Sequence, residues 1–136
     1  AWGADIGPDH TPDEAGLGGA VKLKKNIDFK GRAAVEAQRR KGVKKRLATL
    51  TAAPDVILTG RETIYRDGQR VGWLTSGGFG YTLGRSIGLG YIRDPDGVSA
   101  EFVLSGTYEL EVGTERVPAE VTLDPLYDPK MARVRV

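Results

Sequence analysis

From Val43 to the end of the chain, hydrophobic and polar residues alternate with a period of two. The alternation is clearest over residues 108–112 and 117–123, and it is typical of strands that turn one face to a core. Turn signals separate these runs. Asp67-Gly68 predicts a tight hairpin, and residues 94–97, Asp-Pro-Asp-Gly, predict a longer one. The pattern therefore predicts several short antiparallel strands.

Glycines inside the strand runs indicate how these strands are arranged. Gly72, Gly88 and Gly90 permit the sharp bending that a small closed barrel requires. The pattern shows no helix between the strands, which argues against a parallel α/β sheet. We therefore expect a mainly β fold, a small antiparallel β-barrel of about six strands preceded by a short helical segment.

The first third of the chain predicts the helical segment. Residues 28–41 read as a helix with Asp28 as N-cap and Gly42 just past its end. An apolar residue recurs every four positions, at Phe29, Ala33 and Ala37. Upstream, Thr11-Pro12-Asp13-Glu14 predicts a capping box at a helix start, and Val21 with Leu23 predicts a short strand.

Charge is unevenly distributed although the net charge is only +2. Cations crowd the first third, at Lys22, Lys24, Lys25, Arg32, Arg39, Arg40, Lys41, Lys44, Lys45 and Arg46. One interpretation is a solvated helix face with its flanks. The other is an electrostatic site for an acidic partner or a polyanionic ligand tail. The sequence leaves both open.

Composition excludes several kinds of chemistry. With no cysteine, disulfides, thiolate metal sites and a cysteine nucleophile are excluded, and the single His10 cannot build a multi-histidine metal site. A hydrolase triad is also disfavoured. Glu109 and Glu111 fit the solvent-exposed face of a strand, which argues against a catalytic pair of carboxylates. No apolar run is long enough to span a membrane, so neither a metal nor a membrane is expected.

The glycine-rich stretch Thr75–Tyr81 invites comparison with phosphate-binding loops. It lacks the Gly-Lys-Ser/Thr of a Walker loop, and residues 86–91 after it read as strand rather than helix. We therefore interpret the stretch as a connection across the barrel. Basic residues near Tyr65, Trp73 and Tyr81 suggest nucleic-acid binding, but a net charge of +2 argues against it.

Five segments together resemble the C-terminal part of the glycine-cleavage T-protein (aminomethyltransferase) family. They are Trp2–Ile6 with Thr11–Gly18, Asp28–Ala34, Val71–Gly80, Leu83–Ile92, and Leu126–Pro129 with Arg133 and Arg135. They occur in order and cover nearly the whole chain. The opening Ala-Trp-Gly-Ala-Asp is nearer the branch that contains the dimethylglycine and sarcosine dehydrogenases.

The resemblance implies transfer of a one-carbon unit from an amine such as glycine, sarcosine or dimethylglycine to tetrahydrofolate. Residues 1–42 would be the tail of the folate-binding domain with a linking helix, and residues 43–136 the C-terminal barrel domain that packs beside the folate site. The folate-contacting Asp and Arg of the family would lie upstream. The chain is thus expected to contain no catalytic residue and to be inactive alone.

The resemblance assigns folate contacts to Trp2, to Arg135 and, less directly, to Arg133. Glu14 matches the glutamate of the family's Thr-Pro-x-Glu turn, and a role in a helix cap would also explain a glutamate at this position. The chain departs from the family pattern at Asp13 and Gly19, which would loosen packing against the folate domain. We also expect Trp2, Leu17 and Phe29 to form an exposed apolar patch where that domain docks.

Cofactors, partners and location also follow from the resemblance alone. Tetrahydrofolate would bind through the upstream domain, the parent chain has room for an FAD domain, and a lipoylated carrier protein is a candidate partner. The location would be the mitochondrial matrix or a bacterial cytoplasm. The alternative function is a non-catalytic barrel that docks nucleic acid or protein, which would show salt-sensitive binding and no affinity for folate.

Overall fold

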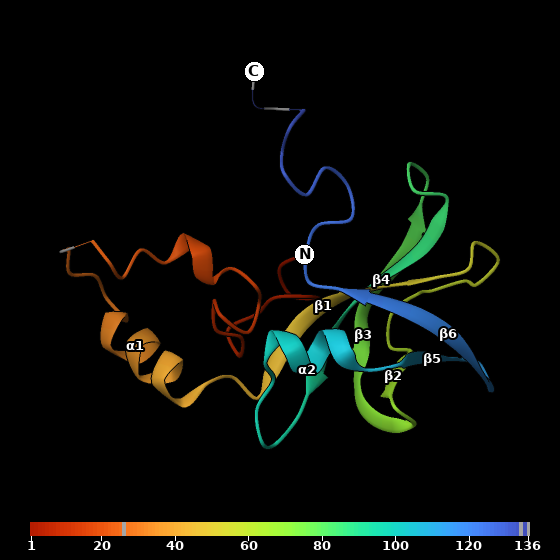
Figure 1. The fold of residues 1–136 in the computed structure, drawn as a ribbon, viewed down its shortest axis with the longest axis horizontal. Helices are drawn as coiled ribbons and strands as arrows, with labels where there is room; N and C mark the ends of the chain where they lie inside the picture. The colour runs from red at the N-terminus through yellow and green to blue at the C-terminus, as the bar shows by residue number, and fades with distance from the viewer. Residues whose placement is uncertain (26, 134, 136) are drawn as a thin grey trace.

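The computed structural model describes residues 1–25, 27–133 and 135 as a six-stranded barrel with a side lobe at the N-terminal end (Figure 1). The elements in chain order are η1 (Gly18–Ala20), α1 (Arg32–Lys41), β1 (Lys45–Ala52), β2 (Thr63–Arg66), β3 (Gln69–Gly80), β4 (Arg85–Arg93), α2 (Ala100–Ser105), β5 (Tyr108–Val112) and β6 (Glu115–Thr122).

The sheet closes on itself in the order β1-β4-β3-β2-β5-β6, with every neighbouring pair antiparallel. The closing pair is β1 with β6, in which Leu50 lies opposite Val121. Closure gives every strand two hydrogen-bonded neighbours, so no sheet edge is left open. The predicted fold class is confirmed, both in the barrel and in the helix that precedes it.

Fully buried aliphatic side chains fill the barrel. Each of the first five strands contributes one, at Leu50, Ile64, Leu74, Ile92 and Leu110. Strand β6 adds the partly buried Val117, Ala119 and Val121. Burying a side chain of this size contributes about 1.5–3 kcal/mol, so these residues account for much of the stability of the barrel. Glu109 and Glu111 alternate with buried Tyr108 and Leu110, as the pattern predicted.

The strand glycines are needed where the barrel is tightest. A Cβ at Gly72 would lie 1.9 Å from the carbonyl oxygen of Tyr91 on the neighbouring strand. A Cβ at Gly88 would lie 2.5 Å from a methyl of Leu74. The bare backbone of β4 therefore makes room both for its neighbour strand and for the core side chain that fills the interior.

Three expectations for the barrel are wrong. The turn at residues 94–97 leads from β4 into α2 and does not form a hairpin between two strands. Helix α2 interrupts the strands between β4 and β5, capped by Ser99, whose hydroxyl accepts the Phe102 N–H at 3.0 Å. Six residues are too few to show a helical period, but they insert Val103 fully into the core. The stretch Thr75–Gly80 is also no connection, because it forms the second half of β3, and the far end of the β3–β4 hairpin extends beyond the barrel (Figure 1).

The side lobe differs from the prediction in its details. Helix α1 begins at Arg32 rather than Asp28, because Gly31 takes a left-handed conformation at the N-cap. None of its ten residues is buried, and Figure 1 shows the helix apart from the strands. The predicted strand at Val21 and Leu23 is absent from these described residues, which form the end of η1 and a turn. The end of α1 at Gly42 is confirmed.

We expect Gly72→Ala to lower the free energy of unfolding by about 1–3 kcal/mol, because the new methyl would overlap the Tyr91 carbonyl oxygen. Gly78→Ala is the matched control on the same strand, since a Cβ there meets no heavy atom of the described residues within 4 Å. It should change stability by less than about 1 kcal/mol. Urea unfolding followed by circular dichroism measures both, and equal losses would contradict the close-approach argument.

Candidate functional site

The first residues of the chain are held on the barrel by a buried carboxylate. Asp5 is only 3% exposed. The hydroxyls of Thr75 and Ser76 on β3 donate to the same oxygen, Asp5 Oδ1, at 2.5 and 2.7 Å. In the 136-residue chain, the amino group of Ala1 donates to the other oxygen, Oδ2. A buried carboxylate needs such partners, because an unpaired one would lose its hydration without replacement.

A β-bulge explains how two consecutive residues reach one oxygen. Successive side chains of a regular strand point to opposite faces of the sheet. The register between β3 and β4 shifts between Leu74 and Ser76, so Thr75 occupies the bulge. The shift brings the Thr75 and Ser76 hydroxyls to the same side of the strand, where Asp5 accepts both.

Hydrogen bonding keeps this carboxylate charged. In the 136-residue chain, burial raises the pKa of Asp5, but hydrogen bonds from the amino group of Ala1, from Thr75 and from Ser76 outweigh burial and hold the pKa below its ordinary value of 3.8. Asp5 is therefore an anion at neutral pH, and each partner donates to it a charge-assisted hydrogen bond.

The same segment covers a tyrosine on the outer face of β4. Tyr91 is buried, its phenol donates to the backbone oxygen of Asp5 at 2.9 Å, and the His10 ring stacks on it at 4.4 Å. Burial, with the nearby charges of Glu14 and Asp5, raises the pKa of Tyr91 to about 12. The phenol thus stays protonated at neutral pH and can keep donating to the Asp5 carbonyl.

The attachment at Asp5 places Gly3 and Ala4, which follow Trp2, at the edge of a hollow. Residues 1–6 form a tight loop in which the Gly3 N–H donates to the Ile6 carbonyl at 2.7 Å. Trp2 leaves 77% of its surface exposed at the tip of this loop. The adjacent hollow, of about 520 Å³, is lined by Gly3, Ala4, Arg61, Thr63, Arg70, Trp73, Leu74 and Thr75. Trp2 is not among the residues that line this hollow, which contains two arginines, Arg61 and Arg70.

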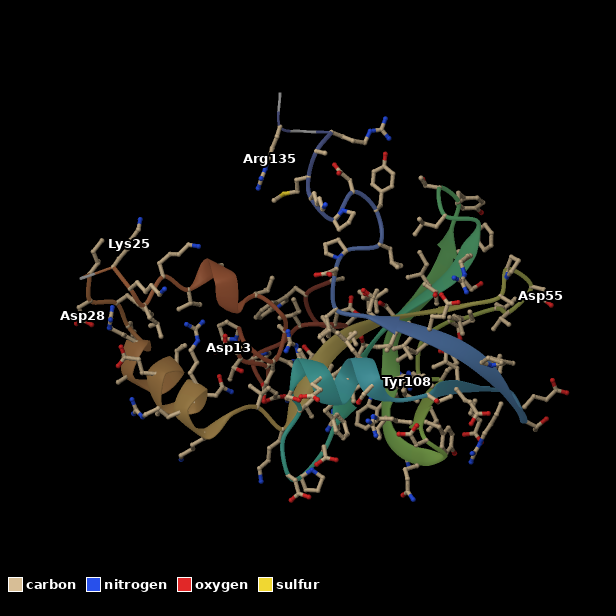
Figure 2. The ribbon with its side chains drawn as sticks, in the orientation of Figure 1. Asp13, Lys25, Asp28, Asp55, Tyr108 and Arg135 are labelled. Carbon is tan, nitrogen blue, oxygen red and sulfur yellow. The ribbon has the colours of Figure 1, made fainter. Side chains whose placement is uncertain are left out.

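The predicted folate residues are not brought together. Arg133 and Arg135 lie on the tail that follows β6, and Figure 2 shows Arg135 away from the strands. Arg133 bonds Tyr127 of the same tail, and its backbone N–H donates to Asp128 at 2.9 Å. Within the described residues no hydrogen bond or ion pair joins either arginine to Trp2. Their folate contacts remain predictions.

Glu14 and Asp13 have structural roles within the chain. The Thr11 N–H donates to the Glu14 carboxylate at 2.9 Å and the Glu14 N–H to the Thr11 hydroxyl at 3.4 Å, so the predicted capping box forms, although as a turn. Asp13 accepts two hydrogen bonds from Arg39 of α1, at 2.8 and 2.9 Å. This pair attaches α1 to the N-terminal segment.

Exposure at the expected docking patch follows the prediction in part. Trp2, Leu17 and Phe29 are each exposed, as the sequence suggested. Tyr81, which the sequence grouped with Tyr65 and Trp73 rather than with this patch, is 89% exposed at the end of the β3–β4 hairpin and contacts Phe79 edge to face at 5.2 Å. The sequence missed Asp5. The adjacent hydroxyls of Thr75 and Ser76 inside a strand were the signal that could have pointed to a buried polar partner.

Within the described residues, no group of three or more His, Asp or Glu side chains lies close enough to hold a metal ion. Nor does any helix in that part of the chain have the length and apolar character to cross a membrane.

Known proteins resemble this chain in sequence and in structure. Residues 45–128 match the family described as the glycine cleavage T-protein C-terminal barrel domain. Mitochondrial sarcosine dehydrogenase of Mus musculus is 44% identical over 136 residues, which is 98% of this chain and 15% of that protein. Mitochondrial dimethylglycine dehydrogenase of Rattus norvegicus is 34% identical over 100% of this chain and 15% of its own length.

A bacterial relative and a solved structure extend the comparison. Aminomethyltransferase of Desulfitobacterium hafniense is 42% identical over 91 residues, 67% of this chain and 25% of that protein. The crystal structure of glycine cleavage system aminomethyltransferase T from Bartonella henselae superposes with a TM-score of 0.74 at 26% identity, covering 89% of this chain and 33% of that one. The chain thus spans about 15% of the dehydrogenases it matches.

Asp5→Asn should lower the free energy of unfolding at pH 7 by about 1–3 kcal/mol, because it removes the charge that Thr75 and Ser76 donate to. The folded-state pKa of Asp5 lies below its ordinary value, so its contribution is present above that value and lost as pH falls through the folded pKa. The difference between the two proteins should therefore shrink below about pH 4.

Urea unfolding of both proteins at pH 7 and pH 3 measures this effect. Asp55→Asn, at an exposed residue of the β1–β2 loop, is the control and should leave stability unchanged at both pH values (Figure 2). A pH-independent difference between Asp5→Asn and the original protein would show that the charge of Asp5 contributes nothing.

Proposed function

Because the chain belongs to the family of glycine cleavage T-protein C-terminal barrel domains, we propose that it is the C-terminal part of a tetrahydrofolate-dependent one-carbon transfer enzyme. The amine donor would be glycine, sarcosine or dimethylglycine, in keeping with the names of its relatives. The chain would close the folate site, and the catalytic residues would lie upstream of it.

We propose a division of the chain at residue 42. Residues 1–42 would be the tail of the folate-binding domain with its linking helix, and residues 43–136 the barrel domain. The family match begins at residue 45, where β1 also begins, which supports this boundary. The absence of any buried residue among the ten of α1 supports a packing partner outside the barrel.

The observation that carries the proposal is the fixed and exposed Trp2. With 77% of its surface exposed, this large indole is free to meet a ligand or another domain. Its loop is held through the Asp5 contacts to Thr75, Ser76 and Tyr91, so the ring is positioned by the barrel. Its flat face fits the pteridine ring of a folate, which could stack on it.

The chemistry assigned to this chain is binding and the exclusion of water. Tetrahydrofolate supplies the amine that receives the one-carbon unit. An iminium formed from the donor amine hydrolyses in water, so a wall that keeps solvent out protects it. Trp2 and the barrel face beside it would supply part of that wall. Arg133 and Arg135 would contact the ligand if the tail turns back toward the folate domain in the full-length protein.

The cofactors and partners of the parent protein follow from its relatives. We propose an upstream FAD domain, since the dehydrogenases that this chain matches are about six to seven times longer than the part aligned here. A lipoylated carrier would be a partner if the donor amine is glycine. The location would be the mitochondrial matrix, as for the relatives named mitochondrial, or a bacterial cytoplasm.

Titration of the full-length protein with tetrahydrofolate tests the proposed function, with tryptophan fluorescence as the signal. We expect saturable binding that Trp2→Ala weakens about tenfold, the loss of one aromatic contact of roughly 1.4 kcal/mol. Tyr81→Ala removes an exposed aromatic at the far hairpin and is the matched control. Absence of folate binding together with tight, salt-sensitive binding of single-stranded DNA would favour the docking alternative.

The isolated 136-residue chain should not bind tetrahydrofolate at micromolar concentrations, because the principal carboxylate and cation contacts would lie upstream. Isothermal titration calorimetry of the chain beside the full-length protein measures the difference. Equal affinity in the two proteins would place the binding determinants within these residues and contradict the proposed division of labour.

A further inference from the structure

The loop between β1 and β2 ends in a carboxylate that binds the backbone of the same loop. Glu62 Oε1 accepts the Thr59 N–H at 2.8 Å and the Thr59 hydroxyl at 3.0 Å. The other oxygen, Oε2, accepts the Gly60 N–H at 2.9 Å. A carboxylate acceptor makes such hydrogen bonds stronger than those between neutral groups. Glu62 therefore fixes residues 59 and 60 relative to the start of β2.

These bonds hold a backbone conformation that the loop would not keep without them. Gly60 has φ +96° and Arg61 has φ +80°, so two consecutive residues are left-handed. An arginine adopts this conformation only at a cost in free energy. Residues of this kind persist where the surrounding contacts fix them. The hydrogen bonds to Glu62 are such contacts, because they restrain the two residues that immediately precede Arg61.

The fixed loop lies against the bulge in β3. The Arg61 N–H donates to the Leu74 carbonyl at 2.7 Å, and the Leu74 N–H donates to the Glu62 carbonyl at 2.8 Å. A Cβ added at Gly60 would lie 3.3 Å from the Ser76 Cα, so the loop backbone packs closely on the bulge. A bulge disrupts the ladder of hydrogen bonds around it, so its position depends on what packs against it. Here the packing element is the loop that Glu62 holds.

The bulge in turn makes the contact that places Trp2. The hydroxyls of Thr75 and Ser76 both donate to Asp5 Oδ1, at 2.5 and 2.7 Å. Hydrogen bonds weaken steeply as distance and angle depart from their optimum, so a displaced bulge would weaken at least one of the two. Asp5 belongs to the tight loop of residues 1–6 that carries the indole. The position of Trp2 therefore depends on Glu62 through the bulge and Asp5.

We propose that Glu62 is a positioning residue for the tetrahydrofolate contact assigned to Trp2. This rests on the proposed function and adds to it a role for the β1–β2 loop. The Glu62 carboxylate binds its own loop, so its effect on the ligand is indirect. A ring that is already held in place loses less conformational freedom when a ligand stacks on it, and affinity rises accordingly.

Hydrogen–deuterium exchange of the full-length protein without folate tests the positioning by itself. Glu62→Ala should speed exchange at the backbone amides of residues 2–10 severalfold, because the Asp5 contacts open more often. Glu62→Gln keeps one acceptor oxygen for Thr59 and should restore most of the protection. Val103→Ala, which truncates a fully buried side chain of α2, controls for a general loss of stability and should leave exchange at residues 2–10 unchanged.

Titration of the same proteins with tetrahydrofolate tests the link to the ligand. Glu62→Ala should weaken binding about threefold, a smaller loss than that expected for Trp2→Ala. Glu115→Ala removes an exposed glutamate at the start of β6 and should leave binding unchanged. Adding Glu62→Ala to Trp2→Ala should cause no further loss, because Glu62 acts through the indole that is already absent.

Three results would overturn the proposal. They are unchanged exchange at residues 2–10 in Glu62→Ala, an equal increase in Val103→Ala, and a further loss of affinity in the double variant. Absence of folate binding by a protein whose exchange responds as expected would overturn the proposed function and leave the positioning of Trp2 by Glu62 standing.

Discussion

The contact between Asp5 and the bulge in β3 holds the first residues of the chain on the barrel. One carboxylate oxygen accepts two hydroxyls, and the backbone of the same residue accepts the Tyr91 phenol. The first ten residues thereby lie on the barrel instead of trailing from it. The position of Trp2, the cover over Tyr91 and one wall of the basic hollow all depend on this contact.

The barrel could be predicted because the sequence signals for its strands are local and recur along the chain. Alternation of hydrophobic and polar residues with a period of two indicates strands directly. Glycines within strands indicate where a neighbouring strand or a core side chain approaches the backbone closely, as at Gly72 and Gly88. Helix α2 was not predicted because it has no repeated signal in the sequence. A single turn and a half shows no period, and its formation depends on a core that accepts Val103. Its cap at Ser99 was a local signal, but one too common to decide the matter alone.

The candidate site was less predictable because it joins residues far apart in the chain. Asp5 meets partners 70 and 71 positions away, and no pattern around it distinguishes a buried aspartate from an exposed one. Trp2 was found only through family resemblance. The same resemblance grouped it with Arg133 and Arg135, which the structure leaves on a separate tail. The cations around Trp73, namely Lys44, Arg61, Arg70 and Arg93, come from two strands and two loops, so only the closed sheet assembles them.

The attachment of α1 has a consequence for the dynamics of the molecule. This helix buries none of its ten residues, and the partly exposed pair of Arg39 with Asp13 is a main link between it and the N-terminal segment. Water and dissolved ions compete for such a pair. In the 136-residue chain alone, the helix is thus a local unit that opens at small free-energy cost while the barrel stays closed, so its amide hydrogens exchange with solvent long before those of the strands.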